Sequence, residues 1–490
     1  MRLITDKLIN KLSHAIIFVG ILLRLREYFA NRSLWVDEAL LALNIIQRSY
    51  RELLEPLSAN QYAPVGFLYV EHTLSKIFDG TELALRLFPL ISGILAIWFF
   101  KKLADQFFTP KYSLLALSLF AFSDILIRYS TEVKQYSTEV LVGIILYLFF
   151  LKKEPNSAKK WLMTIFVGFL SLLFSHAAIF RIFTVGVVEF FASKKKLEWG
   201  TYTVILAVLF ILLYGHDASS AYRDSSFLNE WSYFHLLFFY PPFFLDNLRI
   251  FWSMITQILG PISAWFGATL AFFGGYSLII KKEFRKLTLL VMPFCLALVA
   301  SGFQKYPFTL RTFLFSVPFL TILIVKGLEF VHARLSSELR NKLTILLFLA
   351  LVFNSCLVAI VHVVSPRQVE ELRPVEDFYE SHKQPNDLTY VYYAADAPFH
   401  YYAWRYQIPL QNLMIGGTAR KNWHQYLTEI ESMHRPGQRF WIIFSHVIVG
   451  TYTNYGPLSE EDYIVNFLNS EGGLITSYHA IGASAYLYQW

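Results

Sequence analysis

Residues 84–100 read ALRLFPLISGILAIWFF and contain a single charge, Arg86. A transmembrane α-helix needs roughly 20 predominantly apolar residues, so this run has nearly the length of a membrane span. Comparable runs recur along the chain. We expect about eleven spans, at residues 12–29, 84–100, 112–127, 136–151, 161–175, 178–193, 199–214, 261–280, 287–302, 312–331 and 343–363. The sequence therefore predicts an α-helical polytopic membrane protein.

The composition supports this fold class. Of the 490 residues, 55% are hydrophobic and only 16% are charged, whereas soluble domains have about 25% charged residues. The mean hydropathy is +0.43. These values exclude a disordered chain, a coiled coil and an ordinary soluble enzyme. The two cysteines, Cys295 and Cys356, lie in apolar runs and provide neither a disulfide framework nor a zinc site.

The charge is distributed unevenly. Residues 1–363 carry 35 basic and 23 acidic side chains, whereas residues 364–490 carry 8 and 13. The basic excess lies in short loops between apolar runs, which is typical of cytoplasmic loops rather than of a nucleic-acid-binding face. We therefore expect no nucleic-acid partner. The lysine clusters predict a multi-pass protein of the cell's inner membrane, with a cytoplasmic N-terminus and an extracytoplasmic C-terminal segment.

The chain divides into two predicted domains. We expect residues 1–363 to form a multi-pass transmembrane domain and residues 364–490 to form a small extracytoplasmic α/β domain. The first domain has two long outer loops, 30–83 and 215–260, and the second loop is expected to be either a mobile lid or an interfacial aromatic belt. We interpret residues 161–193 as a hairpin with its apex near His176, although a single long helix is the alternative.

The first outer loop has two segments with helical periodicity. In the first, Val36–Gln47, Asp37 and Asn44 share one stripe. The second begins near Pro64, a residue that suits a first helical turn, and Glu71 lies on its apolar stripe. We expect amphipathic helices at the membrane surface with Asp37 and Glu71 turned towards protein. The alternative is that the acids serve only the helix dipole.

Several motifs resemble one family. LWVDEALLALNI (34–45) and YAPVGFLYVEHTLSKIFDG followed by TELALRLFP (62–89) resemble the opening of GT-C fold membrane glycosyltransferases. The pattern is similar to protein-mannosyltransferase-like and aminoarabinose-transferase-like enzymes of the glycosyltransferase family 39 type. YSTEVKQYS (129–137) resembles their turn between spans 3 and 4, and RTFLFSVPFLTILIVKGL (311–328) resembles a late span.

The resemblance implies a GT-C-like fold and a hexosyl or pentosyl transferase of the cell envelope. Such an enzyme moves a sugar from a polyprenyl-phosphate donor to a lipid, polysaccharide or protein acceptor at the outer face of the membrane. It implies Asp37 as the base that takes the acceptor hydroxyl's proton, with inversion at the sugar. Glu38 is then expected to orient Asp37 or to bind the acceptor.

The leaving phosphate needs positive charge, and our candidates are Lys134, Arg311 and Arg86. Each has a simpler interpretation as well. Lys134 can pair with Glu132 or Glu139, Arg311 can anchor a lipid headgroup, and Arg86 can pair with Glu82 on its own helix. Side chains expected to bind substrate are Glu71, Tyr62, Glu132, Tyr136 and His72.

One motif departs from the family. Many protein mannosyltransferases have His-Pro-Pro-Leu-Gly-Lys in the second surface helix, where this chain has Tyr62-Ala63-Pro64-Val65-Gly66-Phe67. The lysine is absent, so its role on the donor phosphate must fall to another residue. The lost histidine argues against a protein acceptor.

Carboxylates of the outer face suit Mg²⁺ or Mn²⁺, but their spacing defines no metal site, so we expect no obligatory metal. Two other functions compete with transfer: a flippase or transporter for a lipid-linked sugar, and a non-catalytic subunit of envelope glycan assembly. Transporters tend to have polar or broken segments at midplane in both halves. Here the charges gather at one face, which favours surface chemistry.

Overall fold

The computed structural model describes residues 6–151, 155, 157–221, 249, 252, 255–256, 261–448 and 457–490. The chain forms two compact units. The first, which we call the helical unit, comprises Met1–Phe29, Ser49–Thr73 and Arg86–Pro366. The second, the sheet unit, comprises Ala30–Arg48, Leu74–Leu85 and Arg367–Trp490. Most of the expected outer loop 215–260, with the lid or aromatic belt predicted there, lies outside the described residues.

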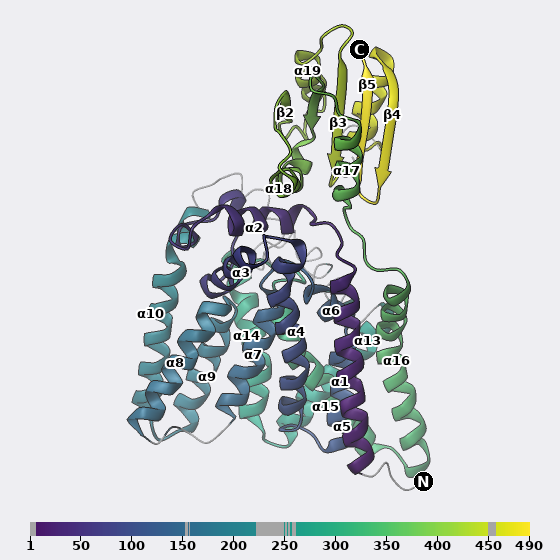
Figure 1. The fold of residues 1–490 in the computed structure, drawn as a ribbon. Helices are drawn as coiled ribbons and strands as arrows, with labels where there is room; N and C mark the ends of the chain where they lie inside the picture. The colour runs from purple at the N-terminus through teal and green to yellow at the C-terminus, as the bar shows by residue number, and fades with distance from the viewer. Residues whose placement is uncertain are drawn as a thin grey trace. The chain divides into compact units, whose positions relative to one another are not determined.

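Long helices build the helical unit (Figure 1). They are α1 (Asp6–Phe29), α4 (Glu82–Ala104), α5 (Pro110–Ala121), α7 (Tyr136–Phe150), α8 (Ala158–Phe174), α9 (Ala178–Ala192), α10 (Lys196–Ala221), α13 (Pro261–Ile280), α14 (Phe284–Gly302), α15 (Val317–Arg334) and α16 (Ser337–Val364). Among the described residues, six segments are long and apolar enough to cross a membrane, in α1, α4, α10, α13, α14 and α15. The predicted polytopic helical class is therefore confirmed.

Two predicted spans show informative details. The run 112–127 does not form a single helix, because α5 ends at Ala121 and α6 (Asp124–Tyr129) begins after an extended Ser123. Residues 161–193 form two helices, α8 and α9, with Ser175–Ala177 between them. The hairpin interpretation of this segment is thus correct, and His176 lies at its apex.

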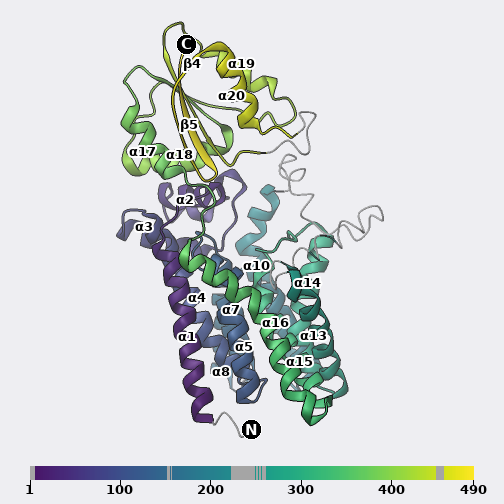
Figure 2. The same ribbon diagram turned by 90° about the vertical axis from the view of Figure 1, so that its right-hand side faces the viewer.

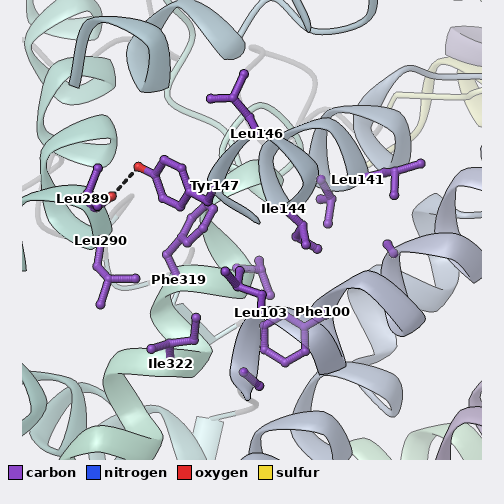
Figure 3. Close-up of a cluster of buried hydrophobic side chains, with 14 of the residues drawn as sticks. Phe100, Leu103, Leu141, Ile144, Leu146, Tyr147, Leu289, Leu290, Phe319 and Ile322 are labelled. Carbon is purple, nitrogen blue, oxygen red and sulfur yellow. Dashed lines mark hydrogen bonds between the residues drawn. The ribbon is translucent and has the colours of Figure 1, made fainter. Parts of the chain in front are cut away.

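Aromatic and aliphatic side chains fill the core of the helical unit (Figure 3). Phe100 of α4 stacks on Phe120 of α5, with ring centroids 4.1 Å apart. Tyr147 of α7 packs against Phe319 of α15, and its hydroxyl donates a hydrogen bond to the Leu289 carbonyl of α14. A buried tyrosine needs such a partner, because an unpaired hydroxyl in an apolar core is costly.

The α13 and α15 backbones approach each other closely at two glycines. A Cβ added to Gly274 would lie 2.0 Å from the Leu323 carbonyl oxygen, and one added to Gly327 would lie 1.8 Å from that of Leu270. Small residues allow this kind of contact between helices in a membrane, where van der Waals packing replaces the hydrophobic effect as the driving force.

The sheet unit contains a five-stranded sheet of order β2-β1-β3-β5-β4. Figure 2 shows two of its strands, β4 and β5. Its strands are β1 (Leu388–Val391), β2 (Leu413–Ile415), β3 (Arg439–Ser445), β4 (Gly473–Ala480) and β5 (Ala483–Gln489). β1 pairs in parallel with β2 and β3, and β5 pairs antiparallel with β3 and β4. The tail helices are α17 (Leu372–His382), α18 (Asp396–Tyr406), α19 (His424–Ser432) and α20 (Glu460–Glu471). The predicted α/β character of the tail is confirmed.

The first outer loop contributes to both units. Its helix α2 (Val36–Gln47) belongs to the sheet unit and packs against α18. The 3₁₀ turns η1 (Glu52–Leu54) and η2 (Ser58–Asn60) belong to the helical unit, as does most of α3 (Val65–Ile77). Both helices expected in this loop are therefore present.

Candidate active site

Helix α2 begins at the two acids that the sequence singled out. Trp35 is extended and its carbonyl accepts the Ala39 amide, so Asp37 and Glu38 lie in the first turn. Acids are favoured there by the helix dipole. Glu38 is fully buried and forms an ion pair with Arg32 at 3.5 Å. Asp37 is partly exposed, so of the two carboxylates it is the one that solvent can reach.

Two consecutive acids of the tail hold the residues that lead into α2. Glu371 Oε2 accepts hydrogen bonds from the Ser33 amide at 3.0 Å and from the Ser33 hydroxyl at 2.8 Å. Glu370 Oε2 accepts the Val36 amide at 2.9 Å. The first amides of a helix have no partner within it, and bonds to a carboxylate are stronger than neutral ones. We call Glu370 and Glu371 the acid clamp.

A second set of bonds reinforces this attachment. Arg373 donates to the Asn31 carbonyl at 2.7 Å and to Glu82 at 3.0 Å, and its own amide donates to the Ser33 hydroxyl. The Tyr402 hydroxyl accepts the Leu34 amide. The acids of α2 are thus positioned by residues that follow them by more than three hundred positions in the sequence.

Sequence reasoning missed the acid clamp. Adjacent acids before a short helix form no motif, and nothing in their spacing points to residue 33. The one available signal was the expectation that Asp37 turns towards protein, which implied that some other segment lies against the loop.

The turn between α6 and α7 holds Lys134, the first candidate for the donor phosphate. Lys134 is 4% exposed, and its ammonium donates to Gln61 Oε1 at 2.7 Å. Gln135 donates to the Tyr62 carbonyl at 3.3 Å. These bonds bring the turn of residues 129–137 against the loop before α3, within the helical unit.

The acid and the tyrosine of the same turn are also engaged. Glu132 is buried and accepts Arg128 Nε at 2.9 Å. Tyr136 packs edge-on against Tyr129, with centroids 5.3 Å apart. The turn is therefore a compact cluster of ionisable groups and aromatic rings.

Helix α3 carries Glu71, which is fully buried. Within the described part of the chain, neither of its carboxylate oxygens has a hydrogen-bond partner. Burial raises the pKa of Glu71 well above its ordinary value. The expectation that Glu71 faces protein is confirmed. Its neighbour His72 is also buried and packs edge-on against Tyr50 at 4.5 Å.

The two remaining cations lie in different environments. Arg86 is buried in α4, and Tyr28 experiences the charges of both Arg86 and Glu71. Glu82, the expected partner of Arg86, accepts a bond from Arg373. Arg311 is partly exposed and precedes η5 (Leu314–Ser316), where its carbonyl accepts the Leu314 amide.

Arg181 of α9 is a buried cation that sequence reasoning missed. It donates to the Phe315 carbonyl at 2.9 Å, and its guanidinium lies 4.8 Å from the Phe315 ring centroid. Two of its nitrogens, Nε and Nη1, have no partner among the residues that the structure describes. Because charges inside a membrane protein are costly and usually functional, the single arginine in an apolar run was the available signal.

The geometry offers no preformed metal site. In the described ranges, no three His, Cys, Asp or Glu side chains converge closely enough to hold an ion. Mg²⁺ prefers near-octahedral oxygen ligands, and two carboxylates of the first outer loop and the turn before α7, Glu38 and Glu132, instead pair with arginines.

Comparison with solved structures identifies the fold. No protein-family model matches the chain, and no curated protein sequence matches it. ArnT from Cupriavidus metallidurans bound to undecaprenyl phosphate superposes with a TM-score of 0.55 at 12% identity, covering 98% of this chain and 97% of that one. Its apo state gives 0.50 over the same shares.

The apo oligosaccharyltransferase of Archaeoglobus fulgidus gives a TM-score of 0.53 at 12% identity, covering 88% of this chain and 69% of that one. These structures have the GT-C fold. The chain is therefore a multi-pass membrane protein with the GT-C fold, as the motifs of the first outer loop predicted.

Proposed function

We propose that this protein is a glycosyltransferase that moves a sugar from a polyprenyl-phosphate donor to an acceptor at the outer face of the membrane. The observation that carries the proposal is the end-to-end fold similarity to ArnT, which was solved with undecaprenyl phosphate bound. The partly exposed Asp37 and the buried Lys134 supply the acid and the cation that such a transfer requires.

In the proposed reaction, Asp37 accepts the proton of the acceptor hydroxyl as its oxygen attacks the anomeric carbon. The bond between that carbon and the phosphate oxygen breaks, and the phosphate leaves with the electron pair. Attack from the face opposite the leaving group inverts the anomeric centre. Glu38, held by Arg32, keeps the start of α2 fixed while Asp37 acts.

Lys134 stabilises the negative charge that develops on the leaving phosphate. Lys134 now donates to the neutral amide oxygen of Gln61. A charged phosphate oxygen is a stronger hydrogen-bond acceptor, so it can displace Gln61 from the ammonium group. Arg86 and Arg311 are proposed as further cations for the same phosphate. Glu71, Tyr62, Glu132, Tyr136 and His72 are proposed to bind substrate.

The proposal places the protein in the cell's inner membrane with an extracytoplasmic tail, and it leaves lipid, polysaccharide and protein acceptors as alternatives. It includes no obligatory metal. Incubation with EDTA is expected to leave transfer unchanged, and recovery of lost activity by Mg²⁺ or Mn²⁺ would refute this part.

Replacing Asp37 with Asn tests the proposal directly. The carboxamide cannot accept the proton, and general bases contribute about 10²–10⁴-fold. We therefore expect transfer from a radiolabelled undecaprenyl-phosphate sugar to fall by about that factor in purified, folded protein. The matched control is Asp377→Asn, an exposed acid on α17, which should retain full activity.

Unchanged transfer by Asp37→Asn would reject Asp37 as the base. Absence of any transfer by the unmodified protein, together with movement of the labelled lipid between leaflets of a vesicle, would favour the flippase or transporter. Absence of both would favour the non-catalytic subunit.

A further inference from the structure

The sheet unit contains a cavity that the proposed reaction has not used. Its volume is about 320 Å³, and its lining includes Glu370, His446, Glu461, His479 and Ser484. Small-molecule sites have volumes of about 300–1,000 Å³. The cavity therefore has the size for a small molecule or one terminal unit of a larger one, and not for a folded polypeptide.

Hydrogen bonds within the sheet unit hold its polar groups in place. Glu370 Oε1 and His446 Nδ1 are 2.6 Å apart. Glu461 Oε1 accepts the hydroxyls of Ser484 and Tyr486, and the Tyr486 ring contacts His479 edge-on with centroids 5.0 Å apart. A site whose side chains are fixed before the ligand arrives avoids much of the ordering cost of binding.

The chemistry of the lining restricts the ligand. A carboxylate only accepts hydrogen bonds, so a ligand can engage the remaining acceptor positions of Glu370 and Glu461 only by donating to them. Two carboxylates repel an anion, and the tail from residue 364 onwards has eight basic against thirteen acidic side chains. A phosphate or an anionic lipid headgroup is therefore disfavoured.

A metal ion does not fit either. The four ionisable side chains surround the cavity without converging on a point, since no three donors in the described ranges are close enough to share an ion. The groups that remain are those rich in hydroxyl or amine donors and free of negative charge, and a neutral or amino sugar is the small ligand that best meets this description.

The cavity is connected to the candidate base through Glu370. Glu370 lines the cavity, and its Oε2 accepts the Val36 amide at 2.9 Å. Val36 precedes Asp37 directly. A ligand that hydrogen-bonds to Glu370 thus contacts the residue that holds the first turn of α2, where Asp37 lies.

We propose that this cavity binds a neutral or amine-bearing sugar unit of the acceptor. The inference rests on the proposed glycosyltransferase function and adds the chemical class of the acceptor. Glu461 and His479 contact the sugar, and Glu370 both contacts it and holds the start of α2.

Saturation-transfer NMR on the full chain in lipid nanodiscs tests this inference. Glucose and glucosamine are the probes, and glucose 6-phosphate is the anionic comparison. We expect both sugars to bind and the phosphate ester to bind at least tenfold more weakly. Glu461→Gln and His479→Ala should each weaken sugar binding about tenfold, whereas Glu431→Gln, an exposed acid of α19, should leave it unchanged.

Circular dichroism and size-exclusion profiles identify any variant that fails to fold. Ser484→Ala is a milder substitution, because it deletes only one hydroxyl that donates to Glu461. Absence of sugar binding to the unmodified chain overturns the inference. Equal binding by the folded cavity variants overturns it as well.

The Asp37→Asn chain separates this inference from the proposed function, because that variant should bind the sugars normally while losing transfer. Lost transfer without any sugar binding to the unmodified chain refutes the cavity and leaves the glycosyltransferase standing. Retained transfer together with normal sugar binding refutes Asp37 as the base and leaves the cavity standing.

Discussion

At Glu71, an ionisable group lies where water cannot reach it. The side chain is fully buried, and in the described part of the chain its carboxylate accepts no hydrogen bond. An isolated buried charge is much more costly than a neutral acid. Burial therefore raises its pKa well above the ordinary value, and folding favours the protonated form.

This burial predicts a pH dependence of stability. A carboxyl group whose pKa is raised by folding binds more protons in the folded state, so its contribution to stability falls as the pH rises above about 4.3, its unfolded value. Glu71→Gln removes the effect. We expect the variant to unfold at a higher temperature than the unmodified protein at pH 7.5, by the equivalent of about 1–3 kcal/mol.

Differential scanning fluorimetry between pH 4 and pH 8 measures this difference, which should shrink towards pH 4. The exposed Glu431→Gln serves as the control. A Glu71→Gln variant that is less stable at pH 7.5 would show that the carboxylate is ionised and held by a partner.

The proposed role of Lys134 also depends on a single group, its ammonium. Lys134→Gln preserves a donor towards Gln61 but removes the charge. Loss of one group that stabilises transition-state charge costs about 10²–10³-fold, so we expect kcat/KM for the lipid donor to fall by that factor. Lys281→Gln, which replaces an exposed lysine beyond α13, should leave kcat/KM unchanged in the same transfer assay. Equal activity of the two variants would remove Lys134 from the proposed site.

Among the elements, α2 depends most on distant residues. Its own sequence provides an apolar face and acids at the first turn, but its entry is fixed by the acid clamp. A hydrogen bond to a charged group contributes about 1.5–3 kcal/mol. The position of α2 is therefore an element-scale property that local propensity does not determine.

Hydrogen exchange measures the strength of this attachment. In Glu371→Ala, the Ser33 amide loses its acceptor, and we expect peptides that cover residues 33–36 to exchange about 10–100-fold faster. Glu371→Gln, which retains an acceptor oxygen, should restore part of the protection. The control is Glu380→Ala, which replaces an exposed acid on α17, the helix that follows Glu371. Unaltered exchange in Glu371→Ala would mean that the helix start is held by other bonds.

Much of the fold is predictable at this scale. Hydrophobic periodicity located α2, α3 and the apolar helices within a few residues, because burial in lipid or protein imposes a strong pattern. It indicated strands at 388–395, 439–444 and 483–488, which correspond to β1, β3 and β5. It missed β2, which has three residues, and β4, whose exposed Leu474 and Ile475 break the alternation of a half-buried strand. It also missed the break between α5 and α6, although Ser123 and Asp124 carried the usual signal of a helix start.

The site is less predictable than the fold. The motifs singled out Asp37 and the turn around Lys134 as candidates, because residue type alone carries chemical meaning there. Arg373, His446 and the acid clamp act through contacts across hundreds of residues, which no local pattern encodes. Whether the boundary predicted at residue 363 separates two domains stays a prediction, and the structure assigns Ala30–Arg48 to the sheet unit.

For the whole molecule, the distribution of charge predicts orientation. The positive-inside rule predicts that the lysine-rich loops face the cytoplasm, and the eleven spans expected from the sequence would then place the tail outside. Alkaline phosphatase, which is active only outside the cytoplasm, should be active when fused after Trp490 and inactive when fused after Lys281, between α13 and α14. The reverse pattern would invert the proposed topology and move the proposed chemistry to the cytoplasmic face.

The acid clamp also has a consequence for biosynthesis. Ser33 and Glu371 are separated by 338 positions, and a ribosome adds the glutamate only after it has synthesised α16, the last helix of the helical unit. The start of α2 cannot acquire this anchor while the chain is still being translated through the bundle. A nascent or prematurely terminated polypeptide thus carries Asp37 on an untethered segment, and completion of the last quarter of the gene product is what secures it.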